Sequence, residues 1–164
     1  MPGPGEPFNG AVDPDDLGRP LYGATFGQAV RRYVKNYAKF SGRASRSEYW
    51  WSRLFLLLLF AAPWLLYMVG AFVLGFGNAV QGEGSGTGAV ATGFGGITMV
   101  LGGLLLFVVF CGTIIPSLAI TWRRLHDADL AGPFYFLSWI PVGDIVVLVF
   151  TILGSKPSGR RFDI

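Results

Sequence analysis

The sequence predicts an all-α, polytopic helical membrane protein: an N-terminal interfacial amphipathic helix followed by three hydrophobic spans. Two observations predict this class. Only 14% of the 164 residues are charged and 52% are hydrophobic, whereas soluble domains carry about 25% charged residues. There are also 29 uncharged residues between Arg53 and Glu83 and 39 between Glu83 and Arg123. About 20 apolar residues suffice to cross the hydrocarbon core of a bilayer, so both stretches are long enough to span it.

Residues 1–24 are predicted to be a disordered acidic tail, and residues 25–162 a single membrane domain. The tail has four carboxylates, several prolines and no periodic pattern of apolar residues, which is the composition of a segment that cannot bury enough apolar surface to fold. Because the chain does not open with a basic segment, a short apolar stretch and a cleavage site, no cleaved signal peptide is expected.

Residues 25–40 are expected to form the interfacial helix. Thr25 and Gln28 match the capping-box pattern that begins a helix. A basic face beside an aromatic face suits the boundary of an anionic bilayer, and the alternative on the same pattern is a helix packed against other protein. The apolar residues recur at alternating steps of four and three, at Phe26, Val30, Tyr33, Tyr37 and Phe40.

The three spans are predicted at about residues 51–75, 97–120 and 134–153. Residues 76–96 are rich in glycine and other turn-tolerant residues, which indicates a flexible exposed loop. The third span is broken at Pro141–Asp144. A full crossing is favoured there, and a re-entrant pair of half-helices is the alternative.

The distribution of cations predicts a cytoplasmic N-terminus. Seven arginines and lysines lie between residues 31 and 53 and none lies in the loop at 76–96, and cytoplasmic segments carry the excess of positive charge. Two crossings return Arg123 and Arg124 to the cytoplasm. The end of the chain conflicts with this rule, because a third crossing would carry Lys156 and two further arginines outside.

The first chemistry-bearing segment is residues 40–50, FSGRASRSEYW. Ser45 and Glu48 form a capping box that satisfies the free amides at the start of the first span, and this structural role is the preferred interpretation. The functional alternative is that Arg43 and Arg46 bind a phosphate headgroup or an acidic partner, since guanidinium groups bind phosphate in a bidentate manner.

The second segment is residues 123–127, RRLHD, at the cytoplasmic end of the second span. If the two spans are antiparallel, Glu48 meets Arg123 or Arg124 at the same depth, so an ion pair between the helices is predicted. Together the two segments would form a cytoplasmic belt whose members have different roles. We expect a structural polar belt of Ser45, Glu48, His126 and Asp127, and lipid or partner binding by Arg43, Arg46, Arg123 and Arg124.

One acid, Asp144, lies within an apolar segment, where an ionised carboxylate costs about 2.5–3.5 kcal/mol. Capping of the following half-helix is favoured, and proton relay or the lining of a water-filled path is the alternative. Cys111 and His126, each the only residue of its type, lie too far apart in depth to act together. No catalytic site, metal site or cofactor is therefore expected.

The two segments together resemble the bacterial inner-membrane family called domain of unknown function 805, whose members carry an FxGRxxRxEYW segment and, two spans in, an RRLHD segment. The resemblance covers about residues 26–162. It departs at residues 131–133, where the family commonly has Ser-Gly-Trp, and at the final Asn-Arg-Phe-Gly of the family, which here is RRFD. What the resemblance implies is a small integral protein of the bacterial cytoplasmic membrane.

These observations predict a non-enzymatic membrane or assembly component whose arginine-rich belt binds anionic phospholipid or an acidic partner protein. Small residues at Ala71 and Gly75 favour a homo-oligomer or a membrane-protein partner, and no nucleic-acid partner is expected. The alternative function is a small oligomeric transporter or channel that uses Asp144.

Overall fold

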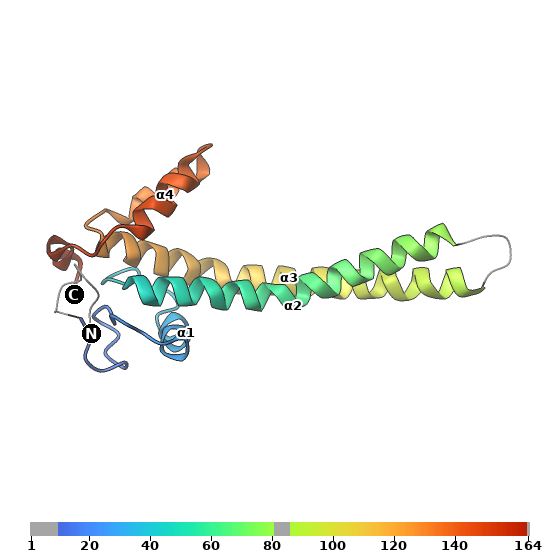
Figure 1. Cartoon of the computed structure of the whole chain (residues 1–164), viewed down its shortest axis with the longest axis horizontal. Helices are drawn as coiled ribbons and strands as arrows, with labels where there is room; N and C mark the ends of the chain where they lie inside the picture. The colour runs from blue at the N-terminus through green and yellow to red at the C-terminus, as the bar shows by residue number, and fades with distance from the viewer. Residues whose placement is uncertain (1–9, 81–85, 164) are drawn as a thin grey trace. The chain divides into compact units, whose positions relative to one another are not determined.

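The computed structural model describes residues 10–80 and 86–163, in which the six regular elements are all helical. The all-α prediction is therefore confirmed for this part of the chain. Figure 1 labels the four α-helices: α1 (Phe26–Lys35), α2 (Arg46–Ala79), α3 (Gly86–Asp127) and α4 (Gly143–Ile152). The 3-10 helices η1 (Gly132–Trp139) and η2 (Pro157–Phe162) precede and follow α4 in the sequence.

The chain divides into two compact units. We call residues 56–80 and 86–113 the hairpin, because they comprise most of α2 and α3. We call residues 10–55 and 114–163 the headpiece, which holds α1, the first turns of α2, the last turns of α3 and everything after α3. Each unit is described by itself.

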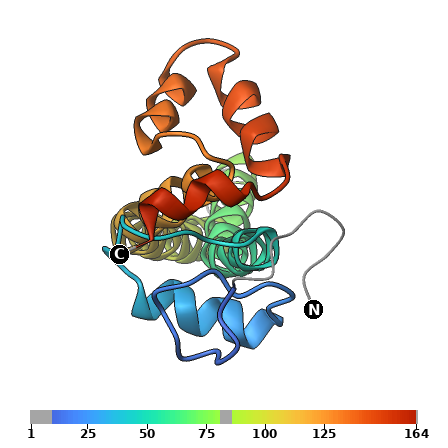
Figure 2. The same ribbon diagram turned by 90° about the vertical axis from the view of Figure 1, so that its left-hand side faces the viewer.

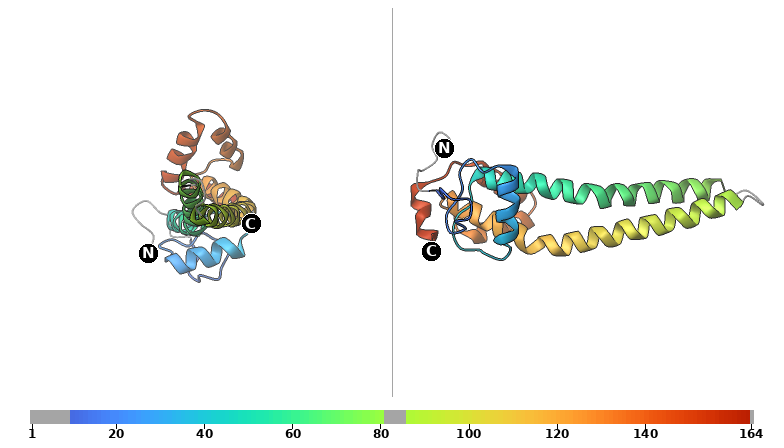
Figure 3. Two further views of the ribbon diagram at one scale, coloured as in Figure 1. Left: turned by 90° about the vertical axis from the view of Figure 1, so that its right-hand side faces the viewer. Right: turned by 90° about the horizontal axis from the view of Figure 1, so that it is seen from below.

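In the hairpin, α2 and α3 run side by side (Figure 3) and touch through glycine. A Cβ atom at Gly70 would lie 2.3 Å from the backbone nitrogen of Met99, and one at Gly95 would lie 2.3 Å from that of Leu74. Distances this short exclude any side chain at these positions, so glycine lets the two backbones approach closely, as small residues do between membrane helices.

The prediction of a flexible loop over residues 76–96 was wrong at both ends. Helix α2 continues to Ala79 and α3 begins at Gly86, and only residues 81–85 of the predicted loop lie outside the described residues. Glycine is common both in flexible loops and at close contacts between helices, and composition alone does not distinguish these two roles. Gly77 and Gly95 lie at close contacts between the helices, while nothing lies within 4 Å of a Cβ at Gly96.

Helices α2 and α3, of 34 and 42 residues, are long and apolar enough to cross a membrane. Only 17% and 11% of the residues in their most apolar windows are buried within the structure, so these are not the core helices of a soluble globule. The first two predicted spans are thus matched by two candidate membrane helices, both longer than expected.

Helix α1 begins as predicted but ends earlier. Gln28 N donates to Thr25 Oγ1 and Thr25 N donates to Gln28 Oε1, which completes the capping box. The helix stops at Lys35, where Asn36 caps it, rather than at residue 40. Its buried face consists of Ala29, Arg32 and Tyr33, so this face packs on protein.

Residues 10–24 were expected to be disordered, yet they have a defined conformation in the headpiece. Leu21 and Ala24 are buried with Ala29 of α1 in a small hydrophobic cluster. The backbone carbonyls of Pro14, Asp16 and Arg19 accept hydrogen bonds from Arg32. The acidic composition predicted disorder because it shows no sign of the contacts that hold this segment. Besides a local hydrogen bond from Ala11 N to the carbonyl of Pro20, the donors come from distant residues, Arg32 of α1 and Ser45 before α2. Residues 1–9 of the predicted tail lie outside the described residues.

No continuous helix covers the third predicted span. Residues 132–139 form η1 and residues 143–152 form α4, and the chain turns between them at Val142, whose φ is +71°. The two short helices pack together, with the rings of Phe134 and Phe150 6.1 Å apart. Within the headpiece, α1 and the η1–α4 pair lie on opposite sides of the paired ends of α2 and α3 (Figures 1 and 2). A ten-residue helix is about 15 Å long, too short to cross a bilayer.

Candidate functional site: a buried polar network

The headpiece contains a set of charged and polar side chains, all buried except the partly exposed Asp163, which we call the polar network. It joins both sequence segments singled out above to the N-terminal segment and to the end of the chain. Its members are Tyr22, Arg32, Arg43, Ser45, Glu48, Arg123, Arg124, His126, Asp127, Ser155 and Asp163.

The capping box at the start of α2 is confirmed. Glu48 N donates to Ser45 Oγ at 3.2 Å, and Ser45 N donates to Glu48 Oε2 at 2.8 Å. The Ser45 hydroxyl in turn donates to the carbonyl of Leu21 at 2.6 Å. The cap therefore starts α2 and also holds the N-terminal segment against it.

Glu48 pairs with an arginine, as predicted, but the arginine lies on α1. Arg32 Nε donates to Glu48 Oε1 in an ion pair with both side chains almost fully buried. The prediction placed the partner at Arg123 or Arg124 because it considered only the two long helices. Folding of α1 against the start of α2 brings Arg32 to the same place.

The carboxylate of Asp127 contacts side chains from several segments of the headpiece. Its carboxylate accepts hydrogen bonds from Arg124 Nη1 at 2.5 Å, from the hydroxyl of Ser155, and from the phenol of Tyr22 at 3.3 Å. Arg43 Nη1 lies 3.7 Å from Asp127 Oδ1. The side chains of Arg43, Arg124 and Asp127 are all 0% exposed.

Arg43 binds the end of the chain. Its Nε and Nη2 donate to the two carboxylate oxygens of Asp163 at 2.8 and 2.6 Å, a bidentate pair. Burial alone would lower the pKa of Arg43, but the hydrogen bond and charge of Asp163 raise it on balance. The guanidinium that was expected to bind a headgroup phosphate therefore already holds a carboxylate of its own chain.

Arg124 and His126 are also used internally. Arg124 Nε donates to the carbonyl of Thr151 at 3.0 Å, and its Nη2 donates to that of Leu153. These carbonyls belong to the last turn of α4 and to its C-cap residue, where backbone acceptors lack helical partners. His126 donates from Nδ1 to the carbonyl of Gly42 at 3.1 Å and stacks on Phe162 with ring centroids 4.0 Å apart. Both residues position the C-terminal segment.

The pKa of the Tyr22 phenol is shifted by its position in the polar network. Burial, followed by the negative charge of Asp127, raises the pKa of its phenol above the ordinary value of 10.0. The phenol therefore remains protonated and continues to donate to Asp127 well above neutral pH.

Arg123 differs from the other buried arginines. It is 3% exposed, and its Nε has no hydrogen-bond partner in the described part of the chain. Glu48 and Arg32 act on it electrostatically with opposite signs. Of the four predicted binding residues, Arg43, Arg123 and Arg124 are buried, whereas Arg46 is partly exposed.

The members that sequence reasoning missed are Tyr22, Arg32, Ser155 and Asp163. Each lies outside the two segments, in a stretch with no motif of its own, so spacing along the chain carries no signal for it. Arg32 does lie on a predicted helix, but it is among the cations that fall away from the apolar face of that helix, so the pattern gives no indication of its burial.

Asp144 lies in the first turn of α4, where its Oδ1 accepts a hydrogen bond from the amide of Ile145 at 2.9 Å. This agrees with the predicted role of satisfying free amides at the start of the half-helix. The N-cap position itself is Val142, which has no side-chain oxygen. Asp144 is exposed.

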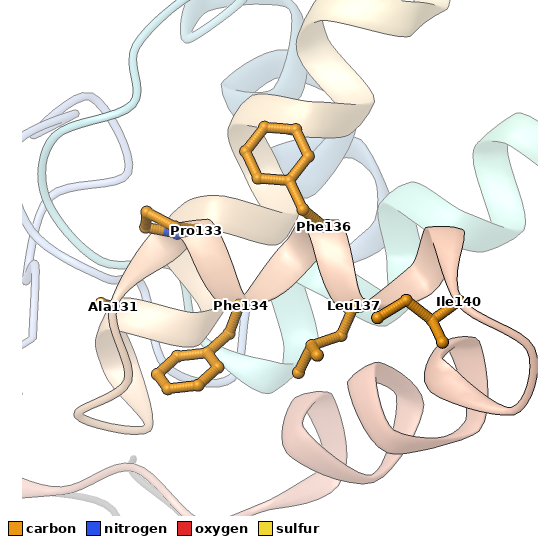
Figure 4. A pocket seen from close by; sticks show the side chains of 6 residues that line it. All are labelled: Ala131, Pro133, Phe134, Phe136, Leu137 and Ile140. Atoms are coloured by element: carbon orange, nitrogen blue, oxygen red, sulfur yellow. The ribbon is translucent and has the colours of Figure 1, made fainter.

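The η1 helix carries an open apolar groove of about 470 Å³ (Figure 4), lined by Ala131, Pro133, Phe134, Phe136, Leu137 and Ile140. None of these side chains has a polar group, so the groove offers no catalytic chemistry. In the described residues no group of three or more His, Cys, Asp or Glu side chains is placed to hold a metal ion. Cys111 is exposed.

Comparison with known proteins gives a match to the family described as "Protein of unknown function (DUF805)" over residues 37–164. The chain belongs to the DUF805 family. Residues 40–50 and 123–127, which carried the resemblance, both fall within the matched range.

Named relatives of this DUF805 chain include two from Escherichia coli (strain K12). It is 31% identical to inner membrane protein YhaH over 132 residues, which cover 80% of this chain and 89% of the relative. It is 31% identical to inner membrane protein YhaI over 133 residues, which cover 79% and 86%. No solved structure matches. Together with the two candidate membrane helices, these names place the DUF805 chain in the inner membrane.

Proposed function

We propose that the protein is a non-enzymatic structural component of the inner membrane, in which the headpiece is held at the cytoplasmic surface of the bilayer and contacts lipid. The observation that carries the proposal is a reversal of the usual surface pattern. Arg43 and Arg124 of the two sequence segments point inward into ion pairs, whereas large apolar side chains of η1 and α4 point outward.

The η1–α4 pair supplies the apolar surface. Its most exposed large side chains are Trp139 at 77%, Val142 at 67%, Ile140 at 58% and Ile145 at 56%. Contiguous exposed apolar surface of this kind marks a membrane or protein contact. Because both helices are too short to span a bilayer, the pair enters one leaflet from the side on which the chain leaves it, as a re-entrant segment does.

Helix α1 gives the headpiece a second contact with the bilayer. Phe26 and Val34 are exposed, as are Arg31 and Lys35. An apolar side chain beside a cation suits the headgroup level.

The cytoplasmic side follows from the cations. Those of residues 31–53 precede the apolar part of α2, and those of residues 156–161 follow α4. An η1–α4 pair that enters and leaves the same leaflet keeps both groups on one side, so the conflict with the positive-inside rule disappears.

Fewer of the four predicted arginines are available to bind anionic lipid or an acidic partner than the sequence suggested. Arg43 and Arg124 have internal ion-pair partners, so they are not available to a ligand. Of the three buried arginines of the belt, Arg123 is the candidate that remains. A transporter that uses Asp144 is not favoured by any observation, because that carboxylate is exposed and bonded to its neighbouring amide.

Labelling of single cysteines with a membrane-impermeant thiol reagent tests this arrangement. In a Cys111→Ala background, Lys35→Cys and Lys156→Cys are both expected to react only when the cytoplasmic side is open to the reagent. Reaction of Lys156→Cys from the opposite side would contradict the proposal, because it requires a third crossing.

A further inference from the structure

Among the residues that the structure describes, the polar network has more arginines than carboxylates. Four buried arginines, Arg32, Arg43, Arg123 and Arg124, face three carboxylates, Glu48, Asp127 and Asp163. Three ion pairs use all of these carboxylates: Arg32 with Glu48, Arg43 with Asp163, and Arg124 with Asp127.

Arg123 is the arginine left over. Within residues 10–80 and 86–163 it has no ion pair, its Nε has no hydrogen-bond partner, and it is 3% exposed. An ionised side chain that is buried without a partner is strongly unfavourable. Glu48 attracts the positive charge of Arg123, but Arg32 repels it. The single negative charge of Glu48 therefore does not balance the charges of both arginines.

The position of Arg123 indicates what would supply the missing charge. It directly follows the uncharged residues 84–122 of the sequence. Its carbonyl accepts a hydrogen bond from Ala44 N at 3.0 Å, which places it beside the start of α2. There Trp50 and Trp51 are 44% and 39% exposed, as is typical of tryptophans at the headgroup level of a membrane.

We propose that Arg123 binds a phosphate group, that of an anionic phospholipid headgroup, and that this phosphate completes the charge balance of the polar network. The proposal rests on the proposed function for its membrane depth. A guanidinium group can donate two parallel hydrogen bonds to phosphate oxygens.

The test uses the full chain, purified in detergent and stripped of lipid, with two probes. The first is phosphatidylglycerol, compared with phosphatidylcholine and measured as lipid retained in native mass spectrometry. The second is inorganic phosphate, measured as a shift of the thermal unfolding midpoint. We expect Arg123→Gln to bind phosphatidylglycerol about tenfold to a hundredfold more weakly than wild type, the range for loss of charge-assisted hydrogen bonds.

Two further variants separate the charge from the fold. Arg161→Gln removes an exposed cation that pairs with Asp129 and is expected to bind phosphatidylglycerol as wild type does. Arg123→Lys keeps the charge without the bidentate fork and is expected to bind with intermediate affinity. If phosphate completes the site, lipid-free Arg123→Gln is also at least as stable as lipid-free wild type, because an unpaired buried charge has been removed.

The source of the phosphate is read from the two probes. Retention of phosphatidylglycerol that Arg123→Gln loses supports a lipid headgroup, and stabilisation by inorganic phosphate alone assigns the site to a free phosphate ion. Equal responses of wild type and Arg123→Gln to both probes would overturn the proposal. That result would leave the thiol-labelling test of the proposed function unaffected, so the two failures can be told apart.

Discussion

Arg124 and Asp127, one turn apart at the end of α3, form an ion pair of 2.5 Å in which both side chains are fully buried. The same carboxylate also accepts hydrogen bonds from Tyr22 and Ser155. Asp127 therefore links three parts of the headpiece that are far apart in sequence. These contacts indicate that the second segment, RRLHD, stabilises the fold of the headpiece.

Asp127→Asn should destabilise the headpiece by about 3–5 kcal/mol, the cost of removing one partner of a buried ion pair. Asparagine has nearly the same size but cannot balance the charges of Arg124 and Arg43. The free energy of unfolding in detergent measures the effect. The matched control is Asp129→Asn, which breaks a pair with the largely exposed Arg161 and should cost about 1 kcal/mol or less. Equal losses in the two variants would contradict the central role of Asp127.

Tyr22→Phe should cost about 1 kcal/mol at neutral pH, because it removes one hydrogen bond to a buried acceptor. Burial raises the pKa of the Tyr22 phenol in the folded state, so the folded protein retains a proton that the unfolded chain releases above its ordinary pKa of 10.0. The stability contributed by Tyr22 is therefore present below about pH 10 and is lost as the pH rises above it. The difference in unfolding free energy between wild type and Tyr22→Phe should shrink above that pH. A constant difference would show that Tyr22 titrates normally.

Arg32→Gln should release residues 10–24, since the guanidinium donates to the carbonyls of Pro14, Asp16 and Arg19. Cleavage within this segment by the endoproteinase Asp-N should become about tenfold faster or more, as expected for loss of charge-assisted hydrogen bonds. The neighbouring Arg31→Gln is the control, because Arg31 is exposed and its ion pair is with the surface carboxylate of Asp15, which contributes little to stability. Rapid cleavage of wild type at the same sites would show that the segment is disordered, as its composition suggested.

Gly95→Ala should destabilise the hairpin by about 1–3 kcal/mol, the usual cost of overpacking. The added Cβ would lie 2.3 Å from the backbone nitrogen of Leu74, so the helices must separate. Gly96→Ala is an adjacent control with nothing within 4 Å of the new atom, and it should leave the thermal unfolding midpoint unchanged or slightly raised. Equal effects at the two positions would mean that the helices do not meet at Gly95.

The sequence allowed the helical class, the two candidate membrane helices and both capping boxes to be predicted, because each depends on contacts within a few residues. Runs of uncharged residues predict long helices directly. Thr25 with Gln28 and Ser45 with Glu48 bond to each other across three positions, so their spacing is sufficient evidence.

The rest depends on contacts between distant segments. The partner of Glu48 was misplaced because Arg32 lies on a helix whose packing has no signal in the sequence. The loop at 76–96 was misread because glycine serves both flexible loops and close helix contacts, as Gly77 and Gly95 show. The inward direction of Arg43 and Arg124 follows from Asp163, Thr151 and Leu153, which are contacts that no local pattern predicts.

The depth of Trp139 in the bilayer tests the account most directly. Trp139→Cys and Lys156→Cys, each in a Cys111→Ala background, are spin-labelled and placed in vesicles that contain phosphatidylglycerol. The accessibility of each label to oxygen and to a water-soluble nickel complex is then measured by electron paramagnetic resonance. We predict that the label at position 139 is accessible to oxygen but not to the nickel complex, because it lies within the bilayer. The label at position 156 is predicted to be accessible to the nickel complex. A label at Trp139 as open to nickel as the one at Lys156 would contradict the account, because the η1–α4 pair would then lie in water.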